Sequence, residues 1–138
     1  MNLKDENPDI LNFLANLSND EVFTPTKLAS RVLEELPDDI WSNPDIKILD
    51  PVCKTGIFLR EAASKLNKGL KNKIKDDKKR IDHILKNQIY GIAITELTSL
   101  VSRRSVYYSR DTKSKFSICK KFNDGNGNIL YNISNHKW

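Results

Sequence analysis

The chain is poor in the residues that staple small secreted domains and hold metal ions. It contains two cysteines, Cys53 and Cys119, and two histidines, His83 and His136. Two cysteines make no disulfide framework, and no cysteine or histidine pair has the spacing of metal ligands. We therefore expect no bound metal and a reducing environment, with the cytoplasm as the predicted compartment.

Long hydrophobic runs are also missing. No apolar stretch approaches the ~20 residues that a membrane-spanning helix needs, and residues 1–6 lack the apolar core of a signal peptide. We expect no membrane partner. With 138 residues, of which 38% are hydrophobic and 30% charged, the chain has the size and composition of one folded domain.

The positive charge is unevenly distributed along the chain. The formal net charge is +5, and much of the excess lies in residues 65–80. Such a cluster attracts phosphate backbones, but a solvated surface helix and loop has the same pattern. Arg103 and Arg104, beside Tyr107 and Tyr108, likewise predict either a nucleic-acid contact or the cationic end of a helix. The basic residues of the cluster are Lys65, Lys68, Lys71, Lys73, Lys75, Lys78, Lys79 and Arg80.

Hydrophobic periodicity predicts helices that alternate with two strands. A short helix is expected near residues 10–17, and Thr24-Pro25 begins a second one that Pro37 ends. The alternation of strands and helices predicts an α/β fold with a parallel sheet. Because two strands are few for such a sheet, the chain looks like the first half of something larger. Further on, the pattern predicts a strand over 46–49, helices after Gly56 and around 81–85, a strand over 88–94, and a helix from Glu96 toward Val106.

The C-terminal part of the chain has a different sequence pattern, without helical periodicity. Apolar runs at 116–119 and 129–131 flank the Asn-Asp-Gly-Asn-Gly sequence of residues 123–127, which predicts a β-hairpin. We therefore divide the chain into an N-terminal helical segment (1–45), a strand-and-helix unit (46–108) and a C-terminal hairpin segment (109–138).

The turn at residues 50–56 carries the strongest functional signal. A strand ends in Asp50-Pro51, a turn reaches Gly56, and a helix follows. At the carboxyl edge of a parallel sheet, Asp50 would face the ligand crevice, and Gly56 and the amides of the helix start could hold an anionic group. An ordinary strand-to-helix turn is the alternative. We expect Cys53 to pack rather than to react, and Lys54-Thr55 precedes the glycine, so this is no phosphate loop of nucleotide hydrolases.

This turn also resembles a known cofactor loop. Residues 50–59, Asp-Pro-Val-Cys-Lys-Thr-Gly-Ile-Phe-Leu, are similar to the S-adenosylmethionine-binding loop of DNA adenine-N6 methyltransferases, except that Lys54 replaces a glycine. Upstream, Val-Phe-Thr-Pro at residues 22–25 resembles the turn that packs over the cofactor in that family, although a capped helix start explains it equally. The resemblance implies that S-adenosylmethionine is bound by Phe23, Thr24, Pro25, Asp50, Pro51, Cys53, Thr55, Gly56, Phe58 and Glu96.

The second strand departs from the family pattern. The family has an acidic residue that holds the ribose where this chain has Ala93. Glu96 follows one helical turn later and could replace it, although an acid in a first helical turn also suits the helix dipole.

The Asn-Pro-Pro-Tyr motif, which holds the adenine in this family, is missing from the sequence, and we predict no catalytic residue. The chain thus resembles the amino-terminal part of the methylase region of a restriction–modification protein of the type IIG or type I kind. This implies a partial Rossmann-like methyltransferase fold that is inactive alone, with DNA and the remaining methylase or a restriction subunit as partners. Two alternatives stay open: a degenerate non-catalytic module, and a plain DNA-binding piece that uses the lysines.

Overall fold

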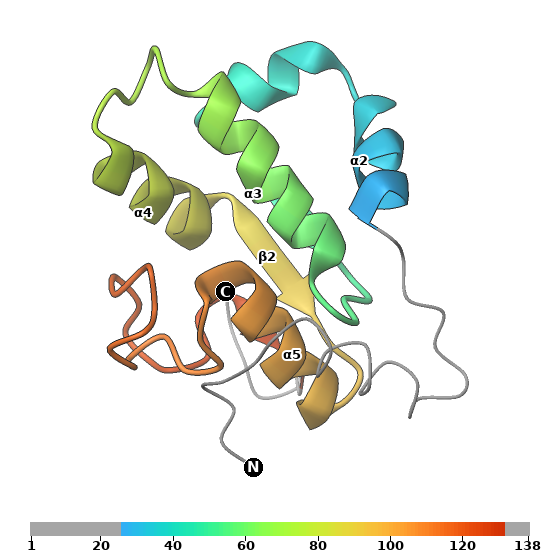
Figure 1. Ribbon diagram of the computed structural model, residues 1–138, viewed down its shortest axis with the longest axis vertical. Helices are drawn as coiled ribbons and strands as arrows, with labels where there is room; N and C mark the ends of the chain where they lie inside the picture. The colour runs from blue at the N-terminus through green and yellow to red at the C-terminus, as the bar shows by residue number, and fades with distance from the viewer. Residues whose placement is uncertain (1–25, 132–138) are drawn as a thin grey trace.

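The computed structural model describes residues 26–131, which form a small sheet with helices around it (Figure 1). The predicted helix near residues 10–17 and the Phe23-Thr24-Pro25 segment lie outside the described residues. The elements are, in chain order, α2 (Thr26–Glu34), the 3-10 helix η2 (Asp38–Ser42), β1 (Ile48–Asp50), α3 (Ile57–Gly69), α4 (Asp77–Asn87), β2 (Ile89–Ile92), α5 (Glu96–Tyr107) and β3 (Ile129–Leu130).

Within the described residues, the sheet has three parallel strands in the order β1-β2-β3. Ile48 pairs with Ile89 and Asp50 pairs with Gly91, so β1 and β2 end at the same edge of the sheet. The predicted α/β class and the two predicted parallel strands are confirmed. We call the edge where the strands end the carboxyl edge, and the opposite one the amino edge.

The predicted C-terminal β-hairpin is wrong. Residues 116–119 form no strand, and Ile129 and Leu130 pair in parallel with β2. The Asp-Gly segment instead bonds to residues further upstream, because the Thr112 N–H donates to the Gly125 carbonyl at 3.0 Å. Both β3 side chains are buried in the folded domain, whereas an isolated two-stranded hairpin would leave them largely exposed.

The helices α3, α4 and α5 contact the sheet, and α3 and α5 lie on the near side of it in Figure 1 with β2 visible between them. Gly91 in β2 makes this packing possible. A Cβ atom at Gly91 would lie 2.7 Å from Cδ1 of Leu59 in α3, so the missing side chain lets α3 approach closely. One hydrophobic cluster joins the helices to the sheet, and its largest fully buried members are Tyr107, Leu59, Leu66, Leu70, Ile84, Ile89 and Ile129.

The basic stretch of residues 65–80 runs from α3 into α4. Because α3 starts at the carboxyl edge and runs back along the sheet, the turn between α3 and α4 lies at the amino edge (Figure 1). Arg80 belongs to the fold, since it is buried and donates to Oδ1 of Asn67 at 2.7 Å and to the Ile74 carbonyl at 2.9 Å. Most of the lysines are exposed. Within residues 26–131, no helix is long and apolar enough to cross a membrane.

Arg103 closes the outer edge of β3. It is 4% exposed, and its Nε and Nη2 donate to the Ile129 carbonyl at 3.0 Å and 2.8 Å. Burial lowers the pKa of this guanidinium below its ordinary value. Nearby, the hydroxyl oxygen of buried Tyr107 accepts from the Asn128 N–H at 2.9 Å. The nucleic-acid contact considered for Arg103 and Tyr107 is therefore wrong, because both side chains are enclosed in the fold.

We predict that Arg103→Met lowers the free energy of unfolding by about 1.5–3 kcal/mol, because it leaves the buried Ile129 carbonyl without its charged donor. Urea denaturation followed by circular dichroism measures this loss. The exposed Arg110→Met is the matched control and should shift stability by less than about 0.5 kcal/mol. Equal effects of the two variants would contradict the role given to Arg103.

Candidate functional site

The site at the carboxyl edge begins with the loop of residues 50–56, which we call the edge loop. Asp50 ends β1, and its Oδ1 accepts from the Val52 N–H at 3.1 Å, which turns the chain back on itself. The Cys53 N–H then donates to the Ile92 carbonyl at 2.8 Å. The edge loop is thereby fastened to the end of the neighbouring strand.

Helix α5 holds the other end of the edge loop. The Ser102 Oγ donates to the Lys54 carbonyl at 3.1 Å. Gly56 has a φ of 81°, and a Cβ atom there would lie 2.9 Å from the Ser102 carbonyl oxygen. Gly56 therefore both makes the left-handed turn into α3 and lets α3 and α5 meet. From the sequence, we expected Gly56 to lie close to a bound ligand. The contact of Ser102 with the edge loop was not predicted, because no residue pattern near Ser102 indicates it.

Cys53 points into the core beneath the edge loop. Its side chain is 1% exposed, and its Sγ would lie 3.0 Å from a Cβ atom on Gly91. Burial raises the pKa of the thiol to about 11. The expectation that Cys53 packs rather than reacts is confirmed, since a buried neutral thiol is a poor nucleophile.

The turn from β2 into α5 forms the other wall of the carboxyl edge. Ala93 is 1% exposed, and its N–H donates to the Leu130 carbonyl at 2.7 Å, which continues the pairing of β2 with β3. Thr95 caps α5 by accepting from the Thr98 N–H at 3.1 Å. Glu96 is the first residue of α5 and is exposed. It is thus the carboxylate that this turn presents to solvent.

The carboxyl group of Asp50 is partly buried. Burial raises the pKa of the Asp50 carboxyl above its ordinary value, and the hydrogen bond from Val52 offsets only part of that rise. A partly desolvated carboxylate is stabilised by a neighbouring cation. The carboxyl edge therefore favours a positively charged group beside Asp50.

The predicted site residues fall into two groups in the structure. Phe23, Thr24 and Pro25 lie outside the described residues, although α2, which begins at Thr26, packs against α3. The rest meet at the carboxyl edge: Pro51 is exposed at the start of the edge loop, Thr55 and Phe58 are partly buried at the start of α3, and Asp50, Cys53, Gly56 and Glu96 lie as described above. Their role in cofactor binding stays a prediction.

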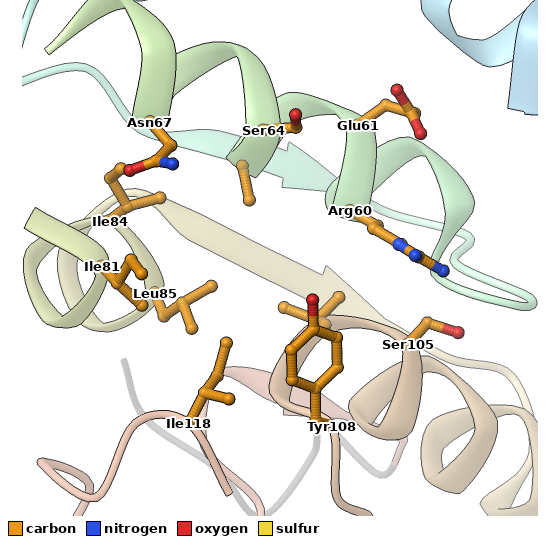
Figure 2. Close-up of a pocket in the computed structure, with 12 residues that line it drawn as sticks. Arg60, Glu61, Ser64, Asn67, Ile81, Ile84, Leu85, Ser105, Tyr108 and Ile118 are labelled. Atoms are coloured by element: carbon orange, nitrogen blue, oxygen red, sulfur yellow. The ribbon is translucent and has the colours of Figure 1, made fainter. Parts of the chain in front are cut away.

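A hollow also lies between the helices that pack on the sheet. Figure 2 shows a groove of about 330 Å³ between α3, α4 and α5, with Arg60, Glu61 and Ser64 from α3 on one side. The Tyr108 hydroxyl points into it from the end of α5. None of the predicted site residues that the structure describes lines this groove, so we do not assign it to the site.

Comparison with known proteins points to methylases. No model of a known protein family matches the chain. Over 143 residues, the chain is 39% identical to a protein of Mycoplasma pneumoniae described as an uncharacterised adenine-specific methylase. The similarity takes in 95% of this chain but 34% of that protein, so the chain spans about a third of the length of its curated relative. The chain is therefore homologous to part of a protein described as a methylase.

Gly56→Ala should destabilise the fold by about 2 kcal/mol or more. A left-handed backbone costs a non-glycine residue roughly 1–2 kcal/mol, and the new Cβ would also crowd the backbone of Ser102. The urea midpoint measures the loss, and Ser64→Ala on the exposed side of α3 is the control. An unchanged midpoint for Gly56→Ala would show that α3 and α5 do not meet at this glycine.

Asp50→Asn should raise stability at neutral pH. Because the folded state raises the Asp50 pKa, the free energy of unfolding falls as pH rises from the ordinary value of 3.8 through the raised value. Asparagine keeps an acceptor for the Val52 N–H but carries no charge. The stabilisation, measured by urea midpoints, should be full at pH 7 and shrink toward pH 4. A pH-independent difference would contradict this reading, and Asp45→Asn, at an exposed carboxylate, is the control.

Proposed function

We propose that this chain is the cofactor-binding part of a DNA adenine-N6 methylase that uses S-adenosylmethionine as its methyl donor. One observation carries the proposal. The Cys53 N–H bond to the Ile92 carbonyl brings the edge loop and the Glu96 turn to the same edge of a parallel sheet. The homologous Mycoplasma pneumoniae protein, described as an adenine-specific methylase, supports the choice of reaction.

The amino-acid end of the donor fits the residues of the edge loop. Its ammonium group matches Asp50, a carboxylate that burial leaves in need of a cation. Its carboxylate matches the first turn of α3, whose N-cap, Gly56, supplies no side-chain cap to the free amides. The donor, when bound, supplies an electrophilic methyl group, and this chain's residues bind and orient it.

The nucleoside end of the donor fits less closely. An acidic side chain at position 93 would lie in the core, where Ala93 is buried. In this proposal, Glu96 at the start of α5 binds the ribose instead. Lys54, partly buried in the edge loop, adds a cation next to the donor. We therefore propose weaker ribose recognition than the family pattern provides.

The target adenine is held elsewhere in this proposal. The sequence contains no Asn-Pro-Pro-Tyr motif, so the chain binds the donor and the remaining methylase binds the base. We further propose that the strands described here belong to a Rossmann-like sheet, and that the methylase serves a restriction–modification system. Its partners are DNA and the remaining methylase or a restriction subunit.

A degenerate module is the second candidate, and a specific observation favours it. Ala93 is buried, and its N–H is hydrogen-bonded within the sheet. The family has its ribose-binding acid at this position, whereas in this chain the residue packs in the core. In this case the chain would keep the fold of a methylase without the donor.

Calorimetric titration separates the two candidates. We expect S-adenosylmethionine to bind with one-to-one stoichiometry, and Asp50→Ala to weaken binding about ten- to hundredfold because a charge-assisted bond is lost. The exposed Asp45→Ala is the control and should bind as the unaltered chain does. Absence of both heat and a thermal shift would favour the degenerate module.

A further inference from the structure

We propose that Asn126 is a site of spontaneous covalent modification, at which the side-chain amide is lost and aspartate or isoaspartate is left in its place. The reaction needs only water, and it does not depend on the proposed function. The site lies in the turn that leads from the Asn-Asp-Gly-Asn-Gly segment into β3. Its reactivity comes from the pair Asn126 and Gly127, and its selectivity comes from the contacts of the turn.

The reaction joins two neighbouring groups of the main chain and the side chain. The backbone nitrogen of Gly127, after losing its proton, attacks the side-chain carbonyl carbon of Asn126. The new C–N bond closes a five-membered succinimide ring, and the side-chain nitrogen takes up a proton and leaves as ammonia. Water then adds to either of the two ring carbonyl carbons and breaks its bond to the ring nitrogen. One opening gives aspartate, and the other gives isoaspartate, whose main chain runs through the former side chain.

Glycine at position 127 makes the pair reactive and is also required by the fold. A side chain after the asparagine would crowd the closing ring, and glycine has none. Asn126 is the one asparagine in the sequence that a glycine follows. Gly127 has a φ of 60°, and a Cβ atom there would lie 2.8 Å from Cε2 of Tyr107. The packing of the turn against Tyr107 therefore retains the reactive pair.

The Asn126 side chain is not held by the turn, whereas that of Asn128 is. Within residues 26–131, the Asn126 side chain forms no hydrogen bond, and its backbone N–H donates to Oδ1 of Asp124 at 2.9 Å. Asn128 Nδ2 donates to the Lys86 carbonyl at 2.7 Å, and the β-branched Ile129 follows it. We therefore expect Asn126 to react and Asn128 to stay intact.

The neighbouring pair Asp124 and Gly125 is a weaker site for the same chemistry. The carboxylate of Asp124 is negatively charged, so its carbon attracts a nucleophile less than an amide carbon does. Its Oδ1 is also bonded to the Asn126 N–H. Modification should thus begin at Asn126.

Isoaspartate in this turn would displace β3. It adds one carbon atom to the main chain directly before Gly127. The next residue, Asn128, is fixed at two points: its N–H donates to the Tyr107 hydroxyl at 2.9 Å, and its side chain donates to the Lys86 carbonyl. Because β3 begins immediately after Asn128, the added length falls on the start of this strand. The modification therefore loosens the pairing of β3 with β2 and leaves the pairing of β1 with β2 intact.

Mass spectrometry of the whole chain, digested after incubation in mildly alkaline heavy-oxygen water, tests the reaction. Asn126 should take up heavy oxygen at least about tenfold faster than Asn123 or Asn128, because only Asn126 precedes a glycine. Asn126→Gln should remain unmodified, since its ring would need six members, and should melt at the temperature of the unaltered chain. Absence of heavy oxygen at Asn126 would overturn the proposal, and so would equal uptake at the three asparagines.

Hydrogen exchange followed by nuclear magnetic resonance tests the effect on the sheet. The N–H groups of Gly91 and Ala93 donate to carbonyls of the β3 segment at 3.0 Å and 2.7 Å, whereas the Ile48 N–H bonds on the other side of β2. In the purified isoaspartate form, the Gly91 and Ala93 protons should exchange at least about tenfold faster, and the Ile48 proton at an unchanged rate.

The freshly purified Asn126→Asp variant is the matched control, because it carries the new charge without the added main-chain carbon. Its Gly91 and Ala93 protons should exchange as they do in the unaltered chain. Unchanged exchange in the isoaspartate form, or equally fast exchange in Asn126→Asp, would overturn the link between the added carbon and β3.

Discussion

The hydrogen bond from the Cys53 N–H to the Ile92 carbonyl is the contact on which the rest of the site depends. It fastens the edge loop to a neighbouring strand, so Asp50 and the Glu96 turn share one edge of the sheet. Ser102 and Gly56 add a second attachment, to α5. Asp50 itself is held in β1, where it pairs with Gly91 of β2.

The edge loop and the cluster of basic residues lie at opposite edges of the sheet. The exposed lysines between α3 and α4 lie at the amino edge, whereas the edge loop lies at the carboxyl edge. A nucleic acid held by these lysines would therefore not be presented to a donor at Asp50 by this chain. The basic stretch and the edge loop are thus independent features.

Much of this architecture can be predicted from the sequence, because it is local. The alternation of apolar residues marks β1, β2 and the helices, and Asp50-Pro51 to Gly56 marks the edge loop. The features that sequence reasoning missed depend on residues far apart in the chain. For example, β3 consists of Ile129 and Leu130 alone, and these two residues form a strand because they pair with β2. Likewise, Arg103 looks like a surface cation until β3 supplies the carbonyl that it binds.

The most direct test of the account is a titration of the isotopically labelled chain with S-adenosylmethionine, followed residue by residue by nuclear magnetic resonance. The account predicts that the largest amide shifts fall on residues 50–58 and 93–97, at the two turns that the Cys53 bond brings together. Shifts confined to the amino edge, at residues 70–79, or to only one of the two turns would contradict it.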